Sequence, residues 1–529
     1  MKIKILDCTL RDGGYVNEWN FGEKTIKSIV RKLEKAKIDI IECGFLTATE
    51  HSKDFSLFND VTKIESVISK KNKNVMHVAM LALGKNEMHP SQLVKNNGKG
   101  IEGIRLTFHK HEITEAVQWA REIITKGYEV FMQPVGLVAY SDFELLDLVQ
   151  KINELQPYAF YIVDTLGSMH SNYVSHVFYI LDENLKEGIR IGFHPHNNLQ
   201  LAYANSQKLT RIQTKRTIII DVSVYGMGRG AGNLPTELIT QYINKNIMSK
   251  YEISDILDIY DEHISLIQQK YDWGYSIAYY IAASYVCHPE YASFLMNKQT
   301  LTMKDIENIV FSIPKEERCL YNKTIIEQLY LDYQNKKIDD SAVIKKMTKL
   351  LETKSVLVLA PGKSLKKNYN QILEFTKKEN SYVISVNFAD SQFEIATCFV
   401  SNHRRVDNII RELDTTKICS VIMTSNISLV ESSKYTYIDY YSYINPDEMV
   451  FDNAGLMLLR FLKTCLVKRV ILAGFDGFQS HYNENYYNEE LNVKTNEMEL
   501  NEKQNRIKTQ LHEMMEEMKI EFLTPSLYE

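Results

Sequence analysis

The sequence predicts an α/β protein in which a (β/α)₈ TIM barrel is followed by a second, doubly wound α/β domain. Roughly the first 240 residues alternate eight short apolar runs with longer amphipathic stretches. Eight βα units in about 250 residues are typical of a closed barrel. A new strand–turn–helix pattern then begins at residue 355, with SVLVLAPGKSLKKN. These observations place a barrel in residues 1–250 and a Rossmann-like domain in residues 351–529.

Each apolar run of the first domain is expected to form one barrel strand. Enough residues separate successive runs for a helix, and this spacing predicts βα units with a parallel sheet. The predicted strands are 2–10, 39–45, 75–81, 103–108, 129–136, 159–165, 190–198 and 218–228.

Residues 251–350 are predicted to be a helical extension or linker. Stretches such as ISDILDIYDEHISLIQQKY repeat apolar residues every three or four positions. Strands return in the last domain, and a final amphipathic helix is expected near 497–518. The strands expected there are the start of SVLVLAPGKSL, 382–390, 397–402, 420–425 and the first part of 467–478.

Composition narrows the class of protein. The 529 residues are 44% hydrophobic and 24% charged, with a net charge of -5 and no basic stripe, which argues against nucleic-acid binding. No apolar run approaches the ~20 residues of a membrane span, and the N-terminus resembles a strand rather than a signal peptide. Seven scattered cysteines without a C-x-x-C pair indicate reduced thiols and a cytoplasmic protein.

Polar residues stand where several barrel strands end, which is the catalytic face of such a barrel. Arg11 and Asp12 end the first strand, Glu42 lies in the second, and Asp164 and Thr165 end the sixth. We expect Glu42, Asp164 and Thr165 to contact substrate.

The HPHNN segment is the most informative motif. Residues i and i+2 of a strand point the same way, so His194 and His196 present two imidazoles to one side at the end of the seventh strand. With Asp12 across the barrel mouth they form a 2-His-1-carboxylate set, which suits a divalent metal with open positions for substrate oxygens. The alternative is that both histidines are ordinary polar loop residues.

Asp12 and the loop after the eighth strand have structural alternatives too. Asp12 could simply pair with Arg11 or a lysine, but Gly13 and Gly14 indicate that the strand has ended, so both side chains can converge on one site. GMGRGAGN is either a tight turn or a loop that carries Asn233 toward the metal or cradles an anion.

Three motifs in order, LDCTLRDGG, HPHNN and GMGRGAGN, resemble the DRE-TIM metallolyase superfamily. That superfamily includes 4-hydroxy-2-oxovalerate aldolases, hydroxymethylglutaryl-CoA lyases and isopropylmalate synthases. The resemblance is nearest to the 4-hydroxy-2-oxoacid aldolases and covers roughly residues 3–300, including CHPEYASFL at 287–295.

The resemblance implies a metal-dependent carbon–carbon lyase. Asp12, His194 and His196 would bind the metal, with Asn233 as a fourth ligand, and Arg11 would stabilise an enolate oxygen. Mn²⁺ is the favoured ion over Mg²⁺, Co²⁺ or Zn²⁺. The substrates would be a 2-oxoacid and an aldehyde, joined or separated through a pyruvate-type enolate, and a homo-oligomer is expected.

Tyr15 departs from the aldolase pattern, because those enzymes have a catalytic histidine at this position. Tyrosine ordinarily has a pKa of ~10 and is a weak base at neutral pH. We keep Tyr15 as the candidate for proton transfer. Two alternatives stay open: Claisen-type condensation with an acyl-CoA, and a non-catalytic barrel that serves as a scaffold for a C-terminal glycosyltransferase.

The second domain carries a glycine turn but no Walker A motif, because Leu357 replaces the first required glycine in front of GKS. Such a turn can hold a phosphate, or be a bare βα turn. Residues 355–485 resemble bacterial sialyltransferases that use CMP-sugars and hydroxymethylpterin-pyrophosphokinase-like domains. The resemblance implies a nucleotide or nucleotide-sugar near Gly362, Ser364, Asn387 and Asp476, and a bifunctional protein of surface polysaccharide biosynthesis.

Overall fold

The computed structural model describes residues 2–68, 74–84, 88–413, 418–427, 432–447, 449–478, 485–488, 491 and 497–529. The chain divides into two compact units, residues 1–293 with 314–322 and residues 294–313 with 323–529. All seven cysteines lie in the described part and are free thiols. No helix among the described residues is long and apolar enough to cross a membrane.

The first unit contains the predicted barrel. Eight parallel strands follow one another around a closed sheet, because β1 pairs with β9 on one side and with β2 on the other. The two-residue β3 (Leu57–Phe58) is added beside β2. The barrel strands are β1 (Lys2–Asp7), β2 (Ile40–Leu46), β4 (Met76–Ala82), β5 (Gly103–Phe108), β6 (Glu129–Pro134), β7 (Ala159–Asp164), β8 (Arg190–Pro195) and β9 (Thr217–Val222). All eight predicted strands are confirmed, although the first and seventh end three residues earlier than expected and the eighth ends six residues earlier.

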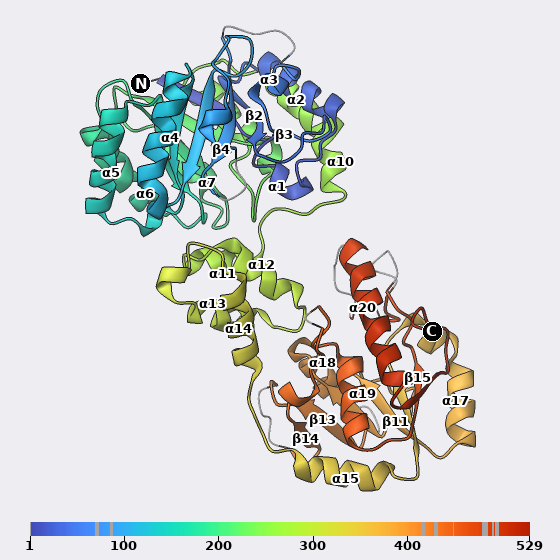
Figure 1. Cartoon of the computed structure of the whole chain (residues 1–529). Coiled ribbons are helices and arrows are strands. Elements are labelled where there is room, and N and C mark those ends of the chain that lie inside the picture. Colours follow the sequence, from blue (N-terminus) through green and yellow to red (C-terminus); the bar gives the residue numbers. More distant parts are fainter. Residues whose placement is uncertain are drawn as a thin grey trace. The chain divides into compact units, whose positions relative to one another are not determined.

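Helices surround this sheet (Figure 1). Their apolar faces pack on the strands, and the larger ones are amphipathic as the sequence predicts. They are α1 (Gly14–Asn17), α2 (Glu23–Lys35), α3 (Val61–Ile64), α4 (Ile113–Thr125), α5 (Asp142–Leu155), α6 (Ser171–Asn184), α7 (Ala202–Leu209), α8 (Thr236–Asn246), α9 (Ile253–Ile259) and α10 (Ser265–Gln268). The next helices in the chain, α11 (Ile277–Ser284) and α12 (Pro289–Asn297), contribute no residue to the described barrel core.

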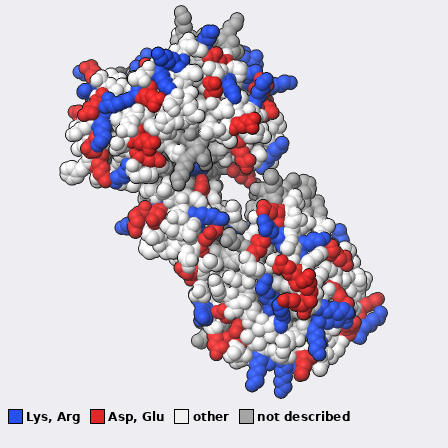
Figure 2. Space-filling view, in the orientation of Figure 1, with Lys and Arg blue, Asp and Glu red and all other residues white. Residues whose placement is uncertain are grey.

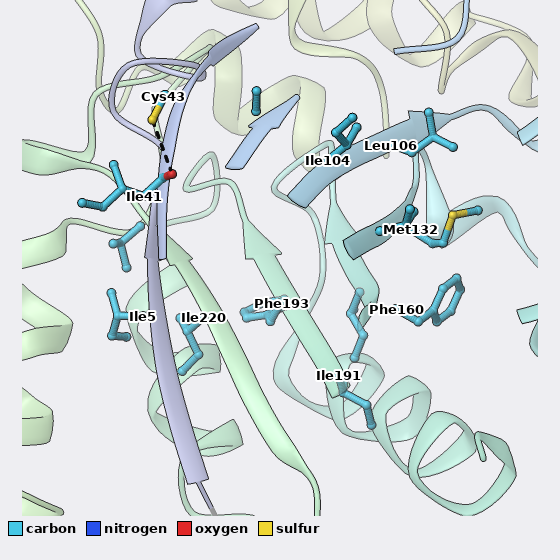
Figure 3. Packing of buried hydrophobic residues seen from close by; sticks show 14 of the residues in the cluster. Ile5, Ile41, Cys43, Ile104, Leu106, Met132, Phe160, Ile191, Phe193 and Ile220 are labelled. Carbon is cyan, nitrogen blue, oxygen red and sulfur yellow. Dashed lines mark hydrogen bonds between the residues drawn. The ribbon is translucent and has the colours of Figure 1, made fainter. Parts of the chain in front are cut away.

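Alternation along the strands separates two cores. Ile5, Phe193 and Ile220 belong to the large cluster between strands and helices (Figure 3). Their strand neighbours Leu6 and Ile219 belong to a smaller cluster formed by inward-facing strand residues. Inward positions near the strand ends are polar instead, and this is where a site can form.

The second unit is built on a seven-stranded parallel sheet with the order β14-β13-β12-β11-β10-β15-β16. Its strands are β10 (Ser355–Leu359), β11 (Ser381–Val386), β12 (Thr397–Val400), β13 (Ser420–Thr424), β14 (Tyr435–Ile438), β15 (Arg469–Ala473) and β16 (Lys519–Phe522). The order reverses between β10 and β15. It is consistent with the predicted doubly wound, Rossmann-like sheet without being specific for it.

The helices of the second unit include part of the segment predicted to be a helical extension. Residues 251–350 contain helices and no strand, and they are shared between the two units. The three-part division at 250 and 350 stays a prediction. The helices are α13 (Met303–Ser312), α14 (Lys323–Gln334), α15 (Ser341–Leu351), α16 (Lys363–Lys367), α17 (Tyr369–Lys378), α18 (His403–Leu413), α19 (Ala454–Thr464) and α20 (Glu497–Met515).

The charged side chains drawn in Figure 2 are mixed in sign over the visible face, and acidic and basic residues alternate over both units. This mixing matches the small net charge of -5. Charges of one sign therefore do not gather on the face that Figure 2 shows.

Candidate active site at the barrel mouth

A tight turn at the end of β1 brings Arg11 and Asp12 to the barrel mouth. The backbone N–H groups of both residues donate to the Cys8 carbonyl, at 3.0 and 2.8 Å. A Cβ on Gly13 would lie 2.3 Å from the Thr9 carbonyl oxygen, so only glycine fits there. The glycine is required by close approach rather than by an unusual backbone angle, since its φ is -60°.

Asp12, His194 and His196 converge, as the sequence predicts. Each offers one ligand atom, and these atoms lie within 4.8 Å of one another. The two imidazole centres are 5.0 Å apart, with the rings nearly perpendicular. His196 lies one residue beyond β8, but an isolated bridge to Asn233 keeps its backbone extended, so the i, i+2 relation holds.

The Asp12 carboxylate is held on both sides. Arg11 Nη1 donates to Asp12 Oδ1 at 2.5 Å, and the Asn233 amide donates to Asp12 Oδ2. Burial opposes ionisation, but Arg11, the two histidines and Asn233 together hold the pKa of Asp12 well below its usual range. Asp12 is therefore a carboxylate at neutral pH, and its pairing with Arg11 coexists with its position in the cluster.

His194 is oriented by a carboxylate that the motif analysis missed. Its Nδ1 lies 2.9 Å from Asp221 Oδ2, and Asp221 also accepts from Arg105 Nη2. All three side chains are buried. A carboxylate on Nδ1 fixes the imidazole proton there and leaves Nε2 as the acceptor nitrogen, which is the usual arrangement of a metal-binding histidine.

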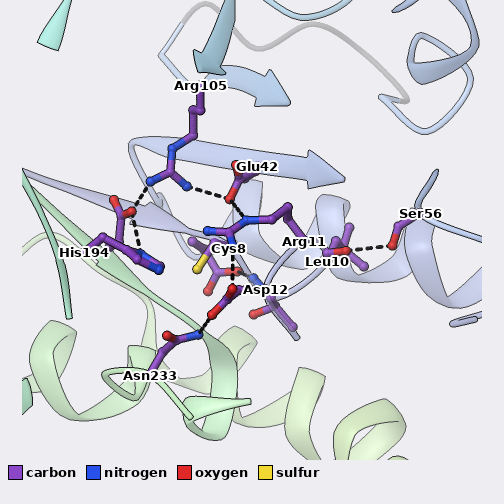
Figure 4. A network of polar contacts seen from close by, with 12 residues as sticks. Cys8, Leu10, Arg11, Asp12, Glu42, Ser56, Arg105, His194 and Asn233 are labelled. Atoms are coloured by element: carbon purple, nitrogen blue, oxygen red, sulfur yellow. Dashed lines mark hydrogen bonds and ion pairs between the residues drawn. The ribbon is translucent and has the colours of Figure 1, made fainter. Parts of the chain in front are cut away.

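Glu42 links the two arginines. Its Oε2 accepts from Arg11 Nε at 3.0 Å and from Arg105 Nη1 at 2.6 Å, and the side chain is fully buried. Figure 4 shows this chain of contacts running from His194 through Arg105 and Glu42 to Arg11, Asp12 and Asn233. Two guanidinium groups among the carboxylates of Asp12, Glu42 and Asp221 leave one negative charge in excess, which favours a bound cation.

The glycine-rich loop after β9 is both a tight turn and a carrier for Asn233. Gly226, Gly230 and Gly232 all have positive φ. At Gly228 a Cβ would lie 2.3 Å from the Asn233 amide nitrogen and 2.9 Å from Asp12 Oδ2. The loop therefore lies directly against the pair of side chains that the sequence assigned to the metal.

Asn198, the last residue of HPHNN, forms hydrogen bonds that connect its own loop to two neighbouring loops. Its Oδ1 accepts from the Ala231 N–H at 2.9 Å, and its Nδ2 donates to the Leu166 carbonyl at 2.9 Å. The Asn197 N–H donates to the Gly232 carbonyl at 2.8 Å. The motif thus supplies both candidate ligands and the contacts that fix their loops.

The side chains of Asp164 and Thr165 accept hydrogen bonds from backbone N–H groups. Asp164 accepts from the N–H groups of Ser168 and Met169, and Thr165 Oγ1 accepts from the Gly136 N–H at 3.0 Å. Burial raises the pKa of Asp164 to about 7, against these hydrogen bonds. Their assignment to substrate stays a prediction.

Tyr15 lies at the edge of the site and is 38% exposed. The Arg229 guanidinium carbon is 4.2 Å from the centre of its ring, and Trp19 packs edge-on at 4.7 Å. Arg229 also donates to His288 Nε2 at 3.2 Å. Burial, together with Arg229, lowers the pKa of His288 to about 3, so this histidine is neutral.

The four cofactor residues predicted in the second unit lie around a separate pocket of about 500 Å³. Gly362, Asn387 and Asp476 line it, at the ends of β10, β11 and β15. Asp476 accepts hydrogen bonds from the backbone N–H and the hydroxyl of Ser364. The turn expected to hold a phosphate therefore already holds a carboxylate of the protein.

Comparisons with known proteins find aldolases that are similar to about half of this chain. A 4-hydroxy-2-oxovalerate aldolase of Geobacillus thermodenitrificans is 28% identical over 275 residues, covering 50% of this chain and 77% of the relative. The protein of that description from Bacillus cereus is 27% identical over 310 residues, covering 56% and 87%. A crystal structure of the N-terminal domain of a candidate aldolase from Bacteroides vulgatus is 25% identical, with a TM-score of 0.48, covering 57% of this chain and 98% of that one.

The family model named HMGL-like matches residues 2–262. The match spans every barrel strand and each of the three motifs. Over residues 2–262 this chain is therefore similar to the HMGL-like proteins.

Proposed function

We propose that the barrel is a divalent-metal-dependent lyase that forms or cleaves a carbon–carbon bond of a 2-oxoacid through a pyruvate-type enolate. The observation that carries the proposal is the convergence of Asp12, His194 and His196 at the barrel mouth. Aldehyde is the proposed second substrate, by analogy with the 4-hydroxy-2-oxovalerate aldolases to which the domain is similar.

The residues present fit a metal ion. Asp12 is ionised, His194 is held by Asp221 in the tautomer that leaves Nε2 as acceptor, and burial lowers the pKa of His196 to about 3 so that it is neutral. Asn233 Oδ1 is buried without a hydrogen-bond partner in the described part of the chain. These four residues would hold the ion, for which Mn²⁺ is our first choice, and when bound it would polarise the 2-oxo group of the substrate.

Arg11 is suited to stabilise the enolate oxygen. Its Nε and Nη1 are fixed by Glu42 and Asp12, whereas its Nη2 is buried and has no partner among the described residues. A buried N–H donor without an acceptor is uncommon in a folded protein. Held in place beforehand, it can donate to an oxygen on which negative charge develops, without rearranging during the reaction.

Tyr15 is the proposed proton donor and acceptor at the substrate carbon. It stands at the mouth, partly exposed, with the cationic Arg229 over its ring. Glu42, Asp164 and Thr165 complete the proposed substrate contacts.

For the second unit we propose a nucleotide or nucleotide-sugar ligand in the 500 Å³ pocket. Its position at the carboxyl ends of parallel strands, where the strand order reverses, is the usual place for ligands in open α/β sheets. A cytoplasmic, homo-oligomeric, bifunctional enzyme of surface polysaccharide biosynthesis is the wider form of the proposal.

The test uses the full chain, stripped with a chelator and then supplied with Mn²⁺ or left without it. Exchange of pyruvate methyl protons in D₂O, followed by NMR, reports enolate formation. We expect exchange only with the metal, and consumption of pyruvate when short aldehydes are added. Condensation with acetyl-CoA instead would favour a Claisen-type synthase, and metal-loaded protein without any exchange would leave the barrel as a scaffold.

A further inference from the structure

Part of the lining of the second unit's pocket comes from residues that no sequence motif marks. Beside the strand ends, it is lined by Lys298, Thr300 and Lys323 from the helical segment of this unit. Lys298 follows α12 directly. The lining also includes Arg405, at the start of α18.

Lys298 is enclosed by aromatic rings. Its Nζ lies 4.8 Å from the ring centre of Phe294, 5.3 Å from that of Tyr330 and 4.6 Å from that of Phe451. Burial lowers the pKa of Lys298. The rings attract the ammonium through their faces but accept no ordinary hydrogen bonds.

The Lys298 ammonium makes no hydrogen bond or ion pair with any described residue, and the charges of Asp452 and Glu327 act on it only from a longer distance. The carboxylate that lines the pocket near it, Asp452, accepts instead from the hydroxyls of Thr300 and Tyr330. Lys323, by contrast, has an ionic partner, because its Nζ lies 3.3 Å from Glu327 Oε1, and its side chain is mostly exposed. An ammonium has three N–H donors, and withdrawing them from water without acceptors is unfavourable.

At the Gly362 turn, by contrast, the hydrogen-bond donors already have an acceptor from the protein. Asp476 takes both the N–H and the hydroxyl of Ser364, and a Cβ on Gly362 would lie 2.6 Å from the Asp476 carboxyl group. A phosphate placed on this turn would meet a carboxylate at close range, and like charges repel. An anionic ligand in this pocket is therefore better placed at Lys298.

We propose that the pocket binds an organic oxyanion, a phosphate or a carboxylate, with Lys298 as its ionic partner. The oxygens of such a group supply the acceptors that Lys298 lacks. The apolar or flat part of the ligand packs on the aromatic lining of Phe475, Phe478 and Tyr486. The nature of that part rests on the nucleotide proposal above, whereas the ionic contact does not.

Calorimetry on the full chain tests the inference. Its probes separate the ionic role of Lys298 from the proposal that the ligand is a nucleotide. The probes are nucleoside monophosphates, the corresponding nucleosides, inorganic pyrophosphate and a sugar acid with a carboxylate. Lys298→Met removes the charge and keeps an apolar chain among the rings, and Lys298→Arg keeps the charge. Lys323→Met is the matched control, because it removes a lysine of the same lining that already has a partner. Thermal melts check that each variant is folded.

We expect the anionic probes to bind, and Lys298→Met to weaken them by about tenfold or more, in line with the loss of one partner of a partly buried charge pair. Lys298→Arg and Lys323→Met should stay within about threefold of the parent chain, and rising salt should weaken binding to the parent chain more than to Lys298→Met.

The outcomes are distinguishable. If nucleotides bind equally well to Lys298→Met and the parent chain, the ionic role of Lys298 is wrong and the nucleotide proposal stands. If pyrophosphate or the sugar acid binds through Lys298 while nucleotides do not, the inference stands and the nucleotide proposal is wrong. If no anionic probe binds, both are wrong.

Discussion

The barrel mouth and the pocket of the second unit handle buried charge in opposite ways. At the barrel mouth, Arg11 and Arg105 are bound by carboxylates of the protein, and the donor atoms that converge are those of Asp12 and two histidines. In the second pocket, the Lys298 ammonium lies among aromatic rings and has no acceptor among the described residues. The first arrangement carries an excess negative charge that suits a cation, and the second presents an ammonium that suits an anion.

This difference teaches how much of each site is fixed before a ligand arrives. The barrel network is a continuous set of ion pairs and hydrogen bonds on closed strands, so the positions of its atoms are determined by the fold. Such preorganisation suits chemistry, since charge that develops in the transition state meets dipoles already in place. The lysine of the second pocket is a single charge on a flexible stem, which suits binding.

The largest effect is expected from Asp12→Asn. The change removes the carboxylate of the proposed metal set and should lower pyruvate proton exchange by at least about 10³-fold, since a bound metal supplies several kcal/mol of transition-state stabilisation. Metal content after dialysis and NMR exchange rates measure it. Asp39→Asn is the matched control, because Asp39 is a partly buried carboxylate just before β2, at the other end of the barrel, bound to Lys250 and Tyr251. Full exchange activity in Asp12→Asn would contradict the proposed site.

Arg11→Lys should lower kcat by about 10²- to 10³-fold, the usual effect of removing one donor to a developing oxyanion. Lysine keeps the charge but cannot contact Glu42, Asp12 and a substrate oxygen with three fixed N–H groups. Metal affinity should change little, so kinetics and metal titration together isolate the role. A loss of metal with unchanged turnover at saturating metal would make Arg11 a support for Asp12 instead.

Asp221→Asn should weaken metal binding by about 10- to 100-fold, as is typical for the partners of metal-binding histidines. The amide no longer holds His194 in one tautomer, and Arg105 loses an ionic partner. Tyr161→Phe is the control, because it removes another hydrogen bond to Asp221 without touching His194. An unchanged metal affinity in Asp221→Asn would show that the His194 orientation does not depend on this contact.

The sequence predicts the barrel because its apolar runs are evenly spaced and number eight, as a (β/α)₈ barrel requires. It predicts Asp12, His194 and His196 because they lie at or just beyond the carboxyl ends of predicted strands. It does not reveal Arg105 and Asp221, which lie inside the apolar runs GIRLTF and IIIDV and meet only when the barrel closes. A single charge within an otherwise apolar strand is the signal that could have found them.

The second unit was harder to predict for a related reason. The GKS turn suggests a phosphate site, but Asp476, which fills it, is 112 residues away in the chain. No local pattern marks Lys298, since its aromatic neighbours Phe294, Tyr330 and Phe451 come from three separate segments. Contacts between distant segments decide which charges are satisfied, and a motif does not carry that information.

The smallest expected effect concerns stability, because the second unit contains an ion pair whose histidine has a raised pKa. His403 lies between Asp305 and the Asn426 carbonyl, at 3.0 and 2.6 Å, so both ring nitrogens face acceptors. Burial opposes protonation, but Asp305 and Asn426 raise the pKa of His403 above its ordinary value. The stabilisation from this group is then fully present below about pH 6.5 and is lost as the pH rises through the raised value.

His403→Gln should lower the stability of the second unit by about 1 to 3 kcal/mol at pH 6, the range for hydrogen bonds of charged groups, and by less at pH 9. The measurement can separate the units, because all three tryptophans, Trp19, Trp119 and Trp273, lie in the first one. In urea unfolding, a transition that changes the circular dichroism without changing the tryptophan fluorescence is the unfolding of the second unit. His176→Gln is the control, since it removes an exposed pair with Asp142 in the barrel unit and should change that transition by no more than about 1 kcal/mol. A destabilisation of equal size at both pH values would mean that His403 contributes packing rather than charge.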